Sequence, residues 1–470
     1  MLARRLCRGL RQKAVGFASA PEVVIGGCGV AGASTAMHLA ERGAKVTIVD
    51  PRPPFTASSQ YSTECYRDFF LDAALVPFMS RSVDILEELA GEANEIGLSR
   101  RGYCLQVMKE IEDQPKALRA AVARKRFFMA FEAFALRASE YGGGPVRRHR
   151  DLPSYQKPSD DFRNPDLVGF DLIGGQENIS SIFPFVAKEA KGLLHARRCG
   201  WLDSQGLGQK MLSKVQWDGG SDGTESRLPC DAVVNAAGAW MPNLSALLGS
   251  GSPLPLVNEV HAKVILHDTK AVIPQSFAPF MVWRDKVTLD WEDEVKQGLR
   301  EMDDTAEGGT VNASAWIGEQ PGGQHLRPAG NGWVVMLWEH LHKHLPIAED
   351  PEMPIESFLD MYPELCLAGL QRMVPDLAQY EGQLGRDTVV DGGYYTNTPD
   401  GRPLIGPHGS PNFFLCGGMG TYGLMGSPAA GELAAMHVMQ EKLPSYASAC
   451  VWPRASRKTE PLVDLLDDSS

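Results

Sequence analysis

A glycine-rich turn between two apolar stretches constrains this chain of 470 residues more than any other feature. The segment 23–50 reads VVIGGCGVAGASTAMHLAERGAKVTIVD, and Val23 to Ile25 predict a short buried strand. A helix is then predicted to about Arg42, and Gly43 ends it in a left-handed conformation. Residues 46–49 predict a second strand. This order of elements is that of a βαβ unit.

The turn matches the pattern G-x-G-x-x-G of dinucleotide-binding sites. Gly27 permits the tight turn, Gly29 lets a pyrophosphate approach the backbone, and Gly32 lets helix and strand pack closely. Asp50 lies 18 positions beyond Gly32, near the spacing of about 20 for a ribose-binding acid. The alternative is a purely structural βαβ unit. Because strand, helix and acid are all present, we predict a dinucleotide bound by Gly27, Cys28, Gly29, Val30, Ala31, Gly32, Asp50 and Pro51.

Two distant stretches favour FAD as that dinucleotide. Residues 228–240, LPCDAVVNAAGAW, predict an apolar strand followed by small residues around Gly238. Residues 412–439 predict a strand, a glycine-rich turn and a helix beginning near Ser427. A flavin ring lies against backbone free of large side chains, and a helix N-terminus would stabilise the negative charge of the reduced ring. The alternative for the second stretch is a core helix with a glycine-rich entry.

Composition excludes several classes of partner and site. The net charge of −12 argues against nucleic acid, and no apolar run reaches the roughly 18 residues of a membrane span. Nine scattered cysteines without a C-x-x-C pair indicate free thiols in a reducing compartment. The run HLHKH at 340–344 has no acid or cysteine beside it, so we interpret it as a polar strand edge and predict no metal site.

Residues 1–20, MLARRLCRGLRQKAVGFASA, differ from the rest of the chain. They contain four arginines and a lysine, no acid, and leucines spaced for one face of a helix. This is the profile of an organellar transit peptide, and the single serine favours the mitochondrial matrix over a plastid. The alternative is a disordered basic tail.

Taken together, the motifs resemble the D-amino-acid oxidase-like family of FAD-dependent oxidoreductases, which includes glycine oxidase, sarcosine oxidase and dimethylglycine dehydrogenase. Besides the stretches above, the resemblance rests on STECYR at 62–67, LLHARRCGWLDSQGL at 193–207 and YYTNTPDGRPLIGP at 394–407. It implies an α/β fold of glutathione-reductase-like type, with a Rossmann-like FAD-binding domain and a substrate domain built on an antiparallel sheet. The implied FAD-binding domain is discontinuous and comprises residues 21–57, 190–245 and 396–445. The substrate domain then comprises 58–189 and 246–395, and 446–470 is a polar tail.

The same resemblance explains the polar segment SSQYSTECYR at 58–67. In the family this segment crosses beneath the flavin ring into the substrate cavity. Glu64, Tyr66 or Arg67 would then face substrate, whereas a solvated turn with Arg67 in a surface ion pair is the alternative. Further cofactor contacts are implied for Ser58, Ser59, Thr63, Gly238, Gly420, Tyr422, Gly423, Leu424 and Met425.

The chain departs from the family pattern at three places. Gly393 occupies the position of a flavin-linking cysteine and no histidine occurs at 51–70, so we predict non-covalent FAD. Met425 stands where some amine oxidases have a substrate-binding lysine. Residues 209–230 are too few for the helix, strand and hairpin of relatives, which predicts an unpaired sheet edge and a weaker adenine site.

The hypothesis for the chemistry is oxidation of a C–H bond next to nitrogen in an amino acid or secondary amine, with hydride transfer to the flavin. A substrate carboxylate would need a cation, and the acceptor could be oxygen, a quinone or an electron-transferring protein. The candidates for this cation are Arg67, His261 and Lys263. If oxygen is the acceptor, Lys263 is the candidate for a cation near the flavin that assists its reaction with oxygen. The exposed face of a half-buried strand is the alternative for His261 and Lys263. The other functional alternative is a catalytically weak or inactive mitochondrial flavoprotein that acts as an assembly factor. The candidate catalytic residues are Arg67, His261, Lys263, Tyr394 and Tyr395.

Overall fold

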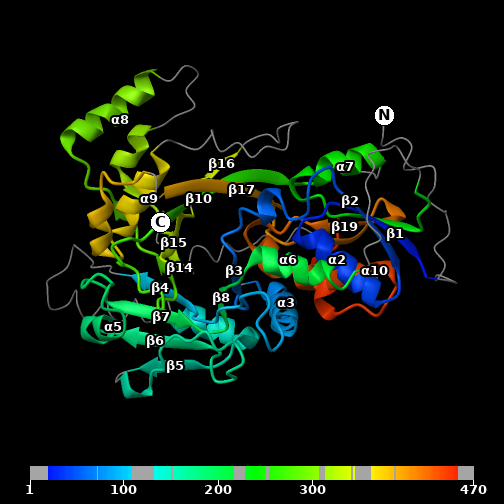
Figure 1. Cartoon of the computed structure of the whole chain (residues 1–470), viewed down its shortest axis with the longest axis horizontal. Coiled ribbons are helices and arrows are strands. Elements are labelled where there is room, and N and C mark those ends of the chain that lie inside the picture. Colours follow the sequence, from blue (N-terminus) through cyan, green and yellow to red (C-terminus); the bar gives the residue numbers. More distant parts are fainter. Residues whose placement is uncertain are drawn as a thin grey trace.

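Two β-sheets organise the chain in this computed structural model (Figure 1). The structure describes residues 20–70, 72–107, 132–149, 152–215, 228–249, 253–305, 313–339, 342–344, 361–385 and 388–453. The predicted transit peptide lies outside these residues apart from Ala20, as does most of the polar tail.

The smaller sheet begins with the predicted βαβ unit. Its strand order is β18-β19-β9-β1-β2, and all neighbours are parallel except β18 and β19. Within the described part of the chain, β2 pairs with β1 alone, so its outer edge has no partner strand. The five strands are β1 (Glu22–Gly26), β2 (Lys45–Val49), β9 (Ala232–Asn235), β18 (Leu404–His408) and β19 (Ser410–Gly417).

Helices cover both faces of the smaller sheet. Val23 and Ile25 of β1 pack with α2 (Val30–Glu41), whereas Val24 faces Met241 of α7 (Met241–Leu248), because neighbouring strand residues point to opposite faces. The helix layer on the first face also contains α3 (Leu75–Ala90), α6 (Ser204–Leu212) and α10 (Gly423–Val438). Small residues let α2 and α10 approach closely: a Cβ on Gly431 would lie 2.2 Å from Ser34 Oγ.

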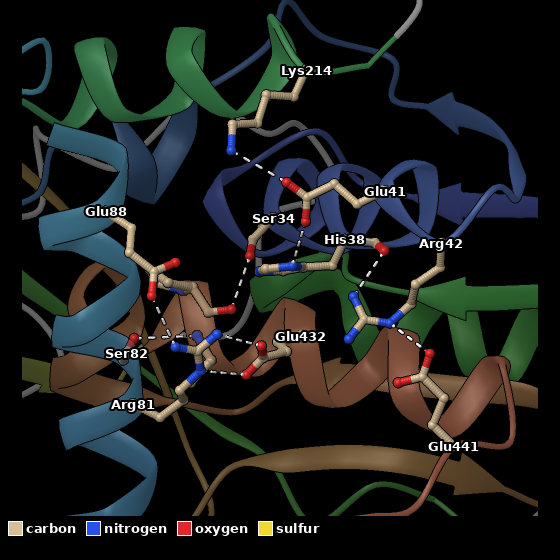
Figure 2. Close-up of polar contacts among 12 residues, drawn as sticks. Ser34, His38, Glu41, Arg42, Arg81, Ser82, Glu88, Lys214, Glu432 and Glu441 are labelled. Carbon is tan, nitrogen blue, oxygen red and sulfur yellow. Dashed lines mark hydrogen bonds and ion pairs between the residues drawn. The ribbon is translucent and has the colours of Figure 1, made fainter. Parts of the chain in front are cut away.

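Ion pairs connect the members of this helix layer (Figure 2). Arg81 of α3 forms two hydrogen bonds to Glu432 of α10, at 2.9 Å from Nε and 2.7 Å from Nη2. Lys214, which follows α6, lies 3.2 Å from Glu41 of α2. The Arg81–Glu432 pair therefore joins chain segments 351 positions apart.

The larger sheet contains ten strands in the described chain and is mostly antiparallel. Its order is β16-β10-β15-β14-β11-β4-β7-β6-β5, and β17 pairs with the other edge of β10. Its strands are β4 (Tyr103–Val107), β5 (Val146–His149), β6 (Phe170–Gly174), β7 (Gly192–Ala196), β10 (Val257–His267), β11 (Phe280–Trp283), β14 (Gln324–Gly330), β15 (Trp333–Trp338), β16 (His342–His344) and β17 (Thr388–Asn397).

Strands β10 and β17 pair over ten residues and extend from the larger sheet towards the smaller one (Figure 1). Between the sheets, β3 (Cys65–Arg67) pairs with β8 (Cys199–Trp201). The remaining α-helices of the described residues are α5 (Gln176–Ile182), α8 (Asp293–Thr305) and α9 (Tyr362–Leu370). A short ribbon is formed by β12 (Val287–Thr288) and β13 (Glu319–Gln320).

The predicted α/β class with parallel and antiparallel sheets is confirmed. Strand β7 belongs to the larger sheet, although the sequence placed residues 190–245 with the smaller one. The domain boundaries themselves stay a prediction. Eight cysteines lie in the described residues, and all are free and buried.

Candidate cofactor site

A cavity of about 530 Å³ lies where the C-terminal ends of β1, β2 and β9 meet. Ligands of open α/β sheets bind at this edge, because the loops that follow neighbouring strands diverge there. The cavity continues along the segment 55–63 and strand β17 to the turn 416–424 before α10. It is therefore long enough to involve both the predicted dinucleotide turn and the second glycine-rich turn.

The dinucleotide turn has no room for side chains. Gly27 has a φ of 111°, and a Cβ there would lie 2.5 Å from the carbonyl oxygen of Ala236. A Cβ on Gly32 would lie 2.0 Å from the carbonyl oxygen of Gly27. Asp50 Oδ2 accepts a hydrogen bond of 2.8 Å from the N–H of Cys28, so this acid also fixes the turn. Exposed backbone at the start of α2 fits a pyrophosphate.

The end of the cavity beyond Asp50 combines a cation with apolar walls. The guanidinium of Arg52 lies 4.0 Å above the ring of Trp240, and its buried Nε and Nη1 have no hydrogen-bond partner among the described residues. Val49 and Leu247 also line this end and are 49% and 57% exposed. An adenine ring would cover such apolar side chains, so this end fits the adenosine half of FAD.

The opposite end of the cavity is aromatic and backbone-rich. Tyr394 and Tyr395 of β17 line it, and Tyr395 stacks on His261 with ring centroids 4.1 Å apart. Burial raises the pKa of Tyr395, so its phenol is neutral at physiological pH. A Cβ on Gly393 would lie 3.3 Å from Ser58 Cα, which shows how closely the backbone of segment 55–63 approaches β17.

Most predicted cofactor residues line the cavity. These are Gly27, Cys28, Gly29, Val30, Ala31, Asp50, Pro51, Ser58, Ser59, Thr63, Gly238, Gly420, Gly423 and Leu424. Gly32 instead packs beneath the turn, and Tyr422 donates a 2.6 Å hydrogen bond to the carbonyl of Gly401. Met425 is buried inside α10, because that helix begins at Gly423 and not near Ser427 as predicted.

The other catalytic candidates lie behind the cavity wall. Lys263 is 2.9 Å from Asp391 and donates to the carbonyl of Ser62 at 3.1 Å. His261 Nε2 lies 3.3 Å from Glu259. Arg67 stacks over Phe69 and Phe70 and has no acidic partner among the described residues. Their catalytic roles stay predictions.

The acid and the aromatic residue of the STECYR segment both have structural roles. Glu64 accepts hydrogen bonds from Arg327 at 2.9 Å and from the hydroxyl of Ser204 at 2.9 Å. Tyr66 has no exposed surface and belongs to the core of the smaller sheet. No sequence pattern singled out Arg327, because an arginine within a strand is not distinctive until its partner is known.

Two kinds of feature are absent from the described residues. No three His, Cys, Asp or Glu side chains there are grouped so that they could hold a metal ion. Likewise, none of the described helices has both the length and the apolar character that crossing a membrane requires.

The glycine turn, the adenine-sized end and the aromatic end define a flavin-binding oxidoreductase of two-sheet architecture. A family model described as FAD dependent oxidoreductase, DAO, matches residues 22–436, so the chain belongs to this family and its cofactor is FAD. The residues that line the cavity fit this cofactor, since the glycines leave space for the pyrophosphate. Arg52 lies 3.5 Å from Asp50, and its Nε and Nη1 have no hydrogen-bond partner among the described residues, so they remain available to the cofactor.

Solved structures share the fold at low sequence identity. L-proline dehydrogenase from P. horikoshii has a TM-score of 0.63 and 16% identity, with 93% of this chain and 97% of that chain covered. Glycine oxidase from Bacillus cereus ATCC 14579 has a TM-score of 0.61 and 14% identity, with coverages of 93% and 100%. Iminodiacetate oxidase from Chelativorans sp. BNC1 has a TM-score of 0.56 and 19% identity, with coverages of 90% and 97%. No curated protein sequence matches this chain.

Proposed function

We propose that this FAD-dependent oxidoreductase oxidises a C–H bond next to nitrogen in an amino acid or a secondary amine that carries a carboxylate. The observation that carries the proposal is the guanidinium of Arg67, which has no acidic partner among the described residues and lies two positions beyond Cys65, a residue that lines the cavity. The names of the similar structures support it, because proline, glycine and iminodiacetate all contain an amine and a carboxylate.

Arg67 is the cation best placed for a substrate carboxylate. Lys263 and Arg327 are neutralised by Asp391 and Glu64, whereas Arg67 is held only by aromatic rings among the described residues. Alternate residues of a strand point the same way, so Arg67 shares a side of β3 with Cys65, which lines the cavity. A guanidinium can bind a carboxylate through two parallel hydrogen bonds.

Bound FAD supplies the electron-accepting chemistry, and the chain has to position the substrate and favour a neutral amine. Aromatic and apolar side chains around Tyr395 exclude water, and a desolvated amine loses its proton more easily. The raised pKa of Tyr395 keeps its phenol neutral, so it can donate a hydrogen bond without adding charge. Non-covalent FAD remains part of the proposal, because Gly393 offers no thiol.

The test is anaerobic reduction of the flavin in the purified full chain by a panel of amino acids and secondary amines. Acid precipitation should first release the yellow flavin into the supernatant; a yellow pellet would contradict non-covalent binding. Arg67→Met should raise the substrate concentration for half-maximal reduction by about tenfold to hundredfold, the value of a charge-assisted hydrogen bond. Arg163→Met is the matched control, since Arg163 also stacks on a phenylalanine but no residue within two positions of it lines the cavity, as Cys65 does for Arg67.

The second candidate is a flavoprotein with little or no turnover that serves as an assembly factor. It is favoured by the outer edge of β2, which has no partner strand among the described residues, and by the exposed Val49, which leave the adenine end open. A protein that binds FAD but is reduced by no member of the panel would support this candidate and contradict the first. Reduction of the flavin by any member of the panel, at a rate that supports catalytic turnover, would exclude the second candidate.

We also propose that residues 1–20 direct the chain to the mitochondrial matrix. The basis is their basic, acid-free sequence with regularly spaced leucines. Import into isolated mitochondria, compared with and without these residues, tests the proposal.

The electron acceptor needs an experiment of its own. Oxygen, a quinone and an electron-transferring protein can be distinguished by supplying each to the reduced enzyme and measuring how fast the flavin is reoxidised.

A further inference from the structure

Two buried cations hold the backbone of the loop 62–64 from behind. Ser62 and Thr63 line the cofactor cavity. Lys263 of β10 donates a 3.1 Å hydrogen bond to the carbonyl of Ser62, and Arg327 of β14 donates a 3.0 Å bond to the carbonyl of Thr63. Lys263 and Arg327 are 5% and 2% exposed, so the larger sheet grips consecutive carbonyls of this loop away from water.

Each cation has its own acid. Lys263 lies 2.9 Å from Asp391, and Arg327 lies 2.9 Å from Glu64, which is itself part of the loop. Glu64 has a φ of 62°, a conformation that costs free energy for a residue other than glycine. The four side chains have no net charge, so the cluster fixes the loop in an unusual conformation without placing an excess charge beside the cofactor. We name these four residues the loop clamp.

The clamp also determines where the amide of Thr63 points. A trans peptide places its C=O and N–H on opposite sides, so an N–H of Thr63 is directed away from Lys263, which holds the carbonyl of Ser62. This N–H has no hydrogen-bond partner in the part of the chain that the structure describes. The next amide, of Glu64, is already bonded to Ser62 Oγ at 2.9 Å. Thr63 therefore presents a fixed and unused donor on a loop that lines the cavity.

We propose that the loop clamp positions the Thr63 N–H as a hydrogen-bond donor to the flavin and thereby raises the reduction potential of the bound FAD. A donor fixed in advance stabilises negative charge that develops on the ring during reduction. Lys263 and Arg327 are then positioning residues. This inference depends on FAD as cofactor and not on the identity of the amine substrate.

Redox titration of the FAD-loaded full chain with a reference dye tests the inference. The variants Lys263→Met/Asp391→Leu and Arg327→Met/Glu64→Gln remove one pair each, and both leave the net charge unchanged, because each removes one cation and one acid. We expect each to shift the equilibrium towards oxidised flavin by about tenfold, or about 30 mV for a two-electron couple. The control Arg81→Met/Glu432→Leu removes a comparable pair of the helix layer and should leave the potential unchanged.

Loop-clamp variants that fold, bind FAD and keep the potential of the control would overturn the proposal. Glu64→Gln alone provides the test should the double variants not fold. Removing this negative charge would raise the potential by electrostatics alone, whereas release of the loop should lower it. A lowered potential in Glu64→Gln supports the inference, and a raised or unchanged one contradicts it.

Discussion

The helix layer and the loop clamp use the same kinds of ion pair in different surroundings. Arg81 and Glu432 of the helix layer are 35% and 15% exposed, whereas Lys263 and Asp391 of the clamp are 6% and 16% exposed. The two acids are almost equally exposed, so the contrast lies in the cations: water screens the charge of Arg81 but has little access to that of Lys263. Two ion pairs of similar geometry should therefore contribute unequally to the free energy of unfolding. The following substitutions test this contrast.

The largest effect is expected for Lys263→Met. It leaves Asp391 without its cation behind the loop 62–64, and breaking a buried pair on one side costs about 3–5 kcal/mol. Urea unfolding of the full chain measures the loss. Lys263→Met/Asp391→Leu should recover most of it, and a single variant as stable as the double one would show that Asp391 is not truly buried.

A smaller loss, about 1–2 kcal/mol, is expected for Arg81→Met. The substitution removes two charge-assisted hydrogen bonds to Glu432, but Arg81 is 35% exposed, so water already screens this pair in the wild type. The same unfolding experiment applies, with the visible spectrum of the bound flavin as an internal control. A loss equal to that of Lys263→Met would remove the distinction between the two regions.

Acid pH should act on the two regions in opposite directions. Burial opposes ionisation of Glu432, but Arg81 outweighs it and lowers the pKa; stability from this acid is present above its unfolded pKa and lost as pH falls. Burial raises the pKa of Asp391, and Lys263 opposes this effect only in part. The folded state then binds the proton before the unfolded state does, so stability rises as pH falls through the raised pKa. Each slope is at most about 1.4 kcal/mol per pH unit.

Comparison of the wild type with Glu432→Gln and Asp391→Asn between pH 7 and 4 isolates the two slopes. As pH falls, the free energy of unfolding of the wild type should decrease relative to that of Glu432→Gln. Over the same range it should increase relative to that of Asp391→Asn. Slopes of the same sign would contradict the assignment of the two surroundings.

The smallest effect is expected for Lys214→Met. Lys214 and Glu41 are 41% and 40% exposed, and such a pair contributes less than about 0.5 kcal/mol. The difference from wild type in urea unfolding should disappear in 1 M salt, where the Debye length is about 3 Å. A salt-resistant loss would indicate that the methylene groups of Lys214 matter more than its charge.

Local sequence patterns predicted the part of the site that local geometry controls. The strand, turn, helix and strand at 22–49 follow from neighbouring residues, and the glycines of the turn face backbone at distances that no side chain fits. The start of α10 was predicted too late, because a glycine-rich turn does not reveal which glycine is the first helical residue.

The loop clamp could not be predicted in the same way. Glu64 was expected to face substrate, yet its partner Arg327 is 263 positions away, and pairing of β10 with β17 brings Asp391 to Lys263. Such contacts depend on sheet register between distant segments, which a single sequence does not specify. The open adenine end is an intermediate case, since the short segment 209–230 predicted an unpaired edge but not the stacking of Arg52 on Trp240.

The buried cysteines have a consequence for the chemical durability of the protein. Burial raises the pKa of the Cys28 and Cys416 thiols to about 11 and that of Cys366 to about 12. Oxidants and alkylating agents attack the thiolate, which is scarce at neutral pH for such groups. The cysteines of the folded protein should therefore be oxidised slowly. This includes oxidation by the peroxide that forms at its own flavin when oxygen is the acceptor.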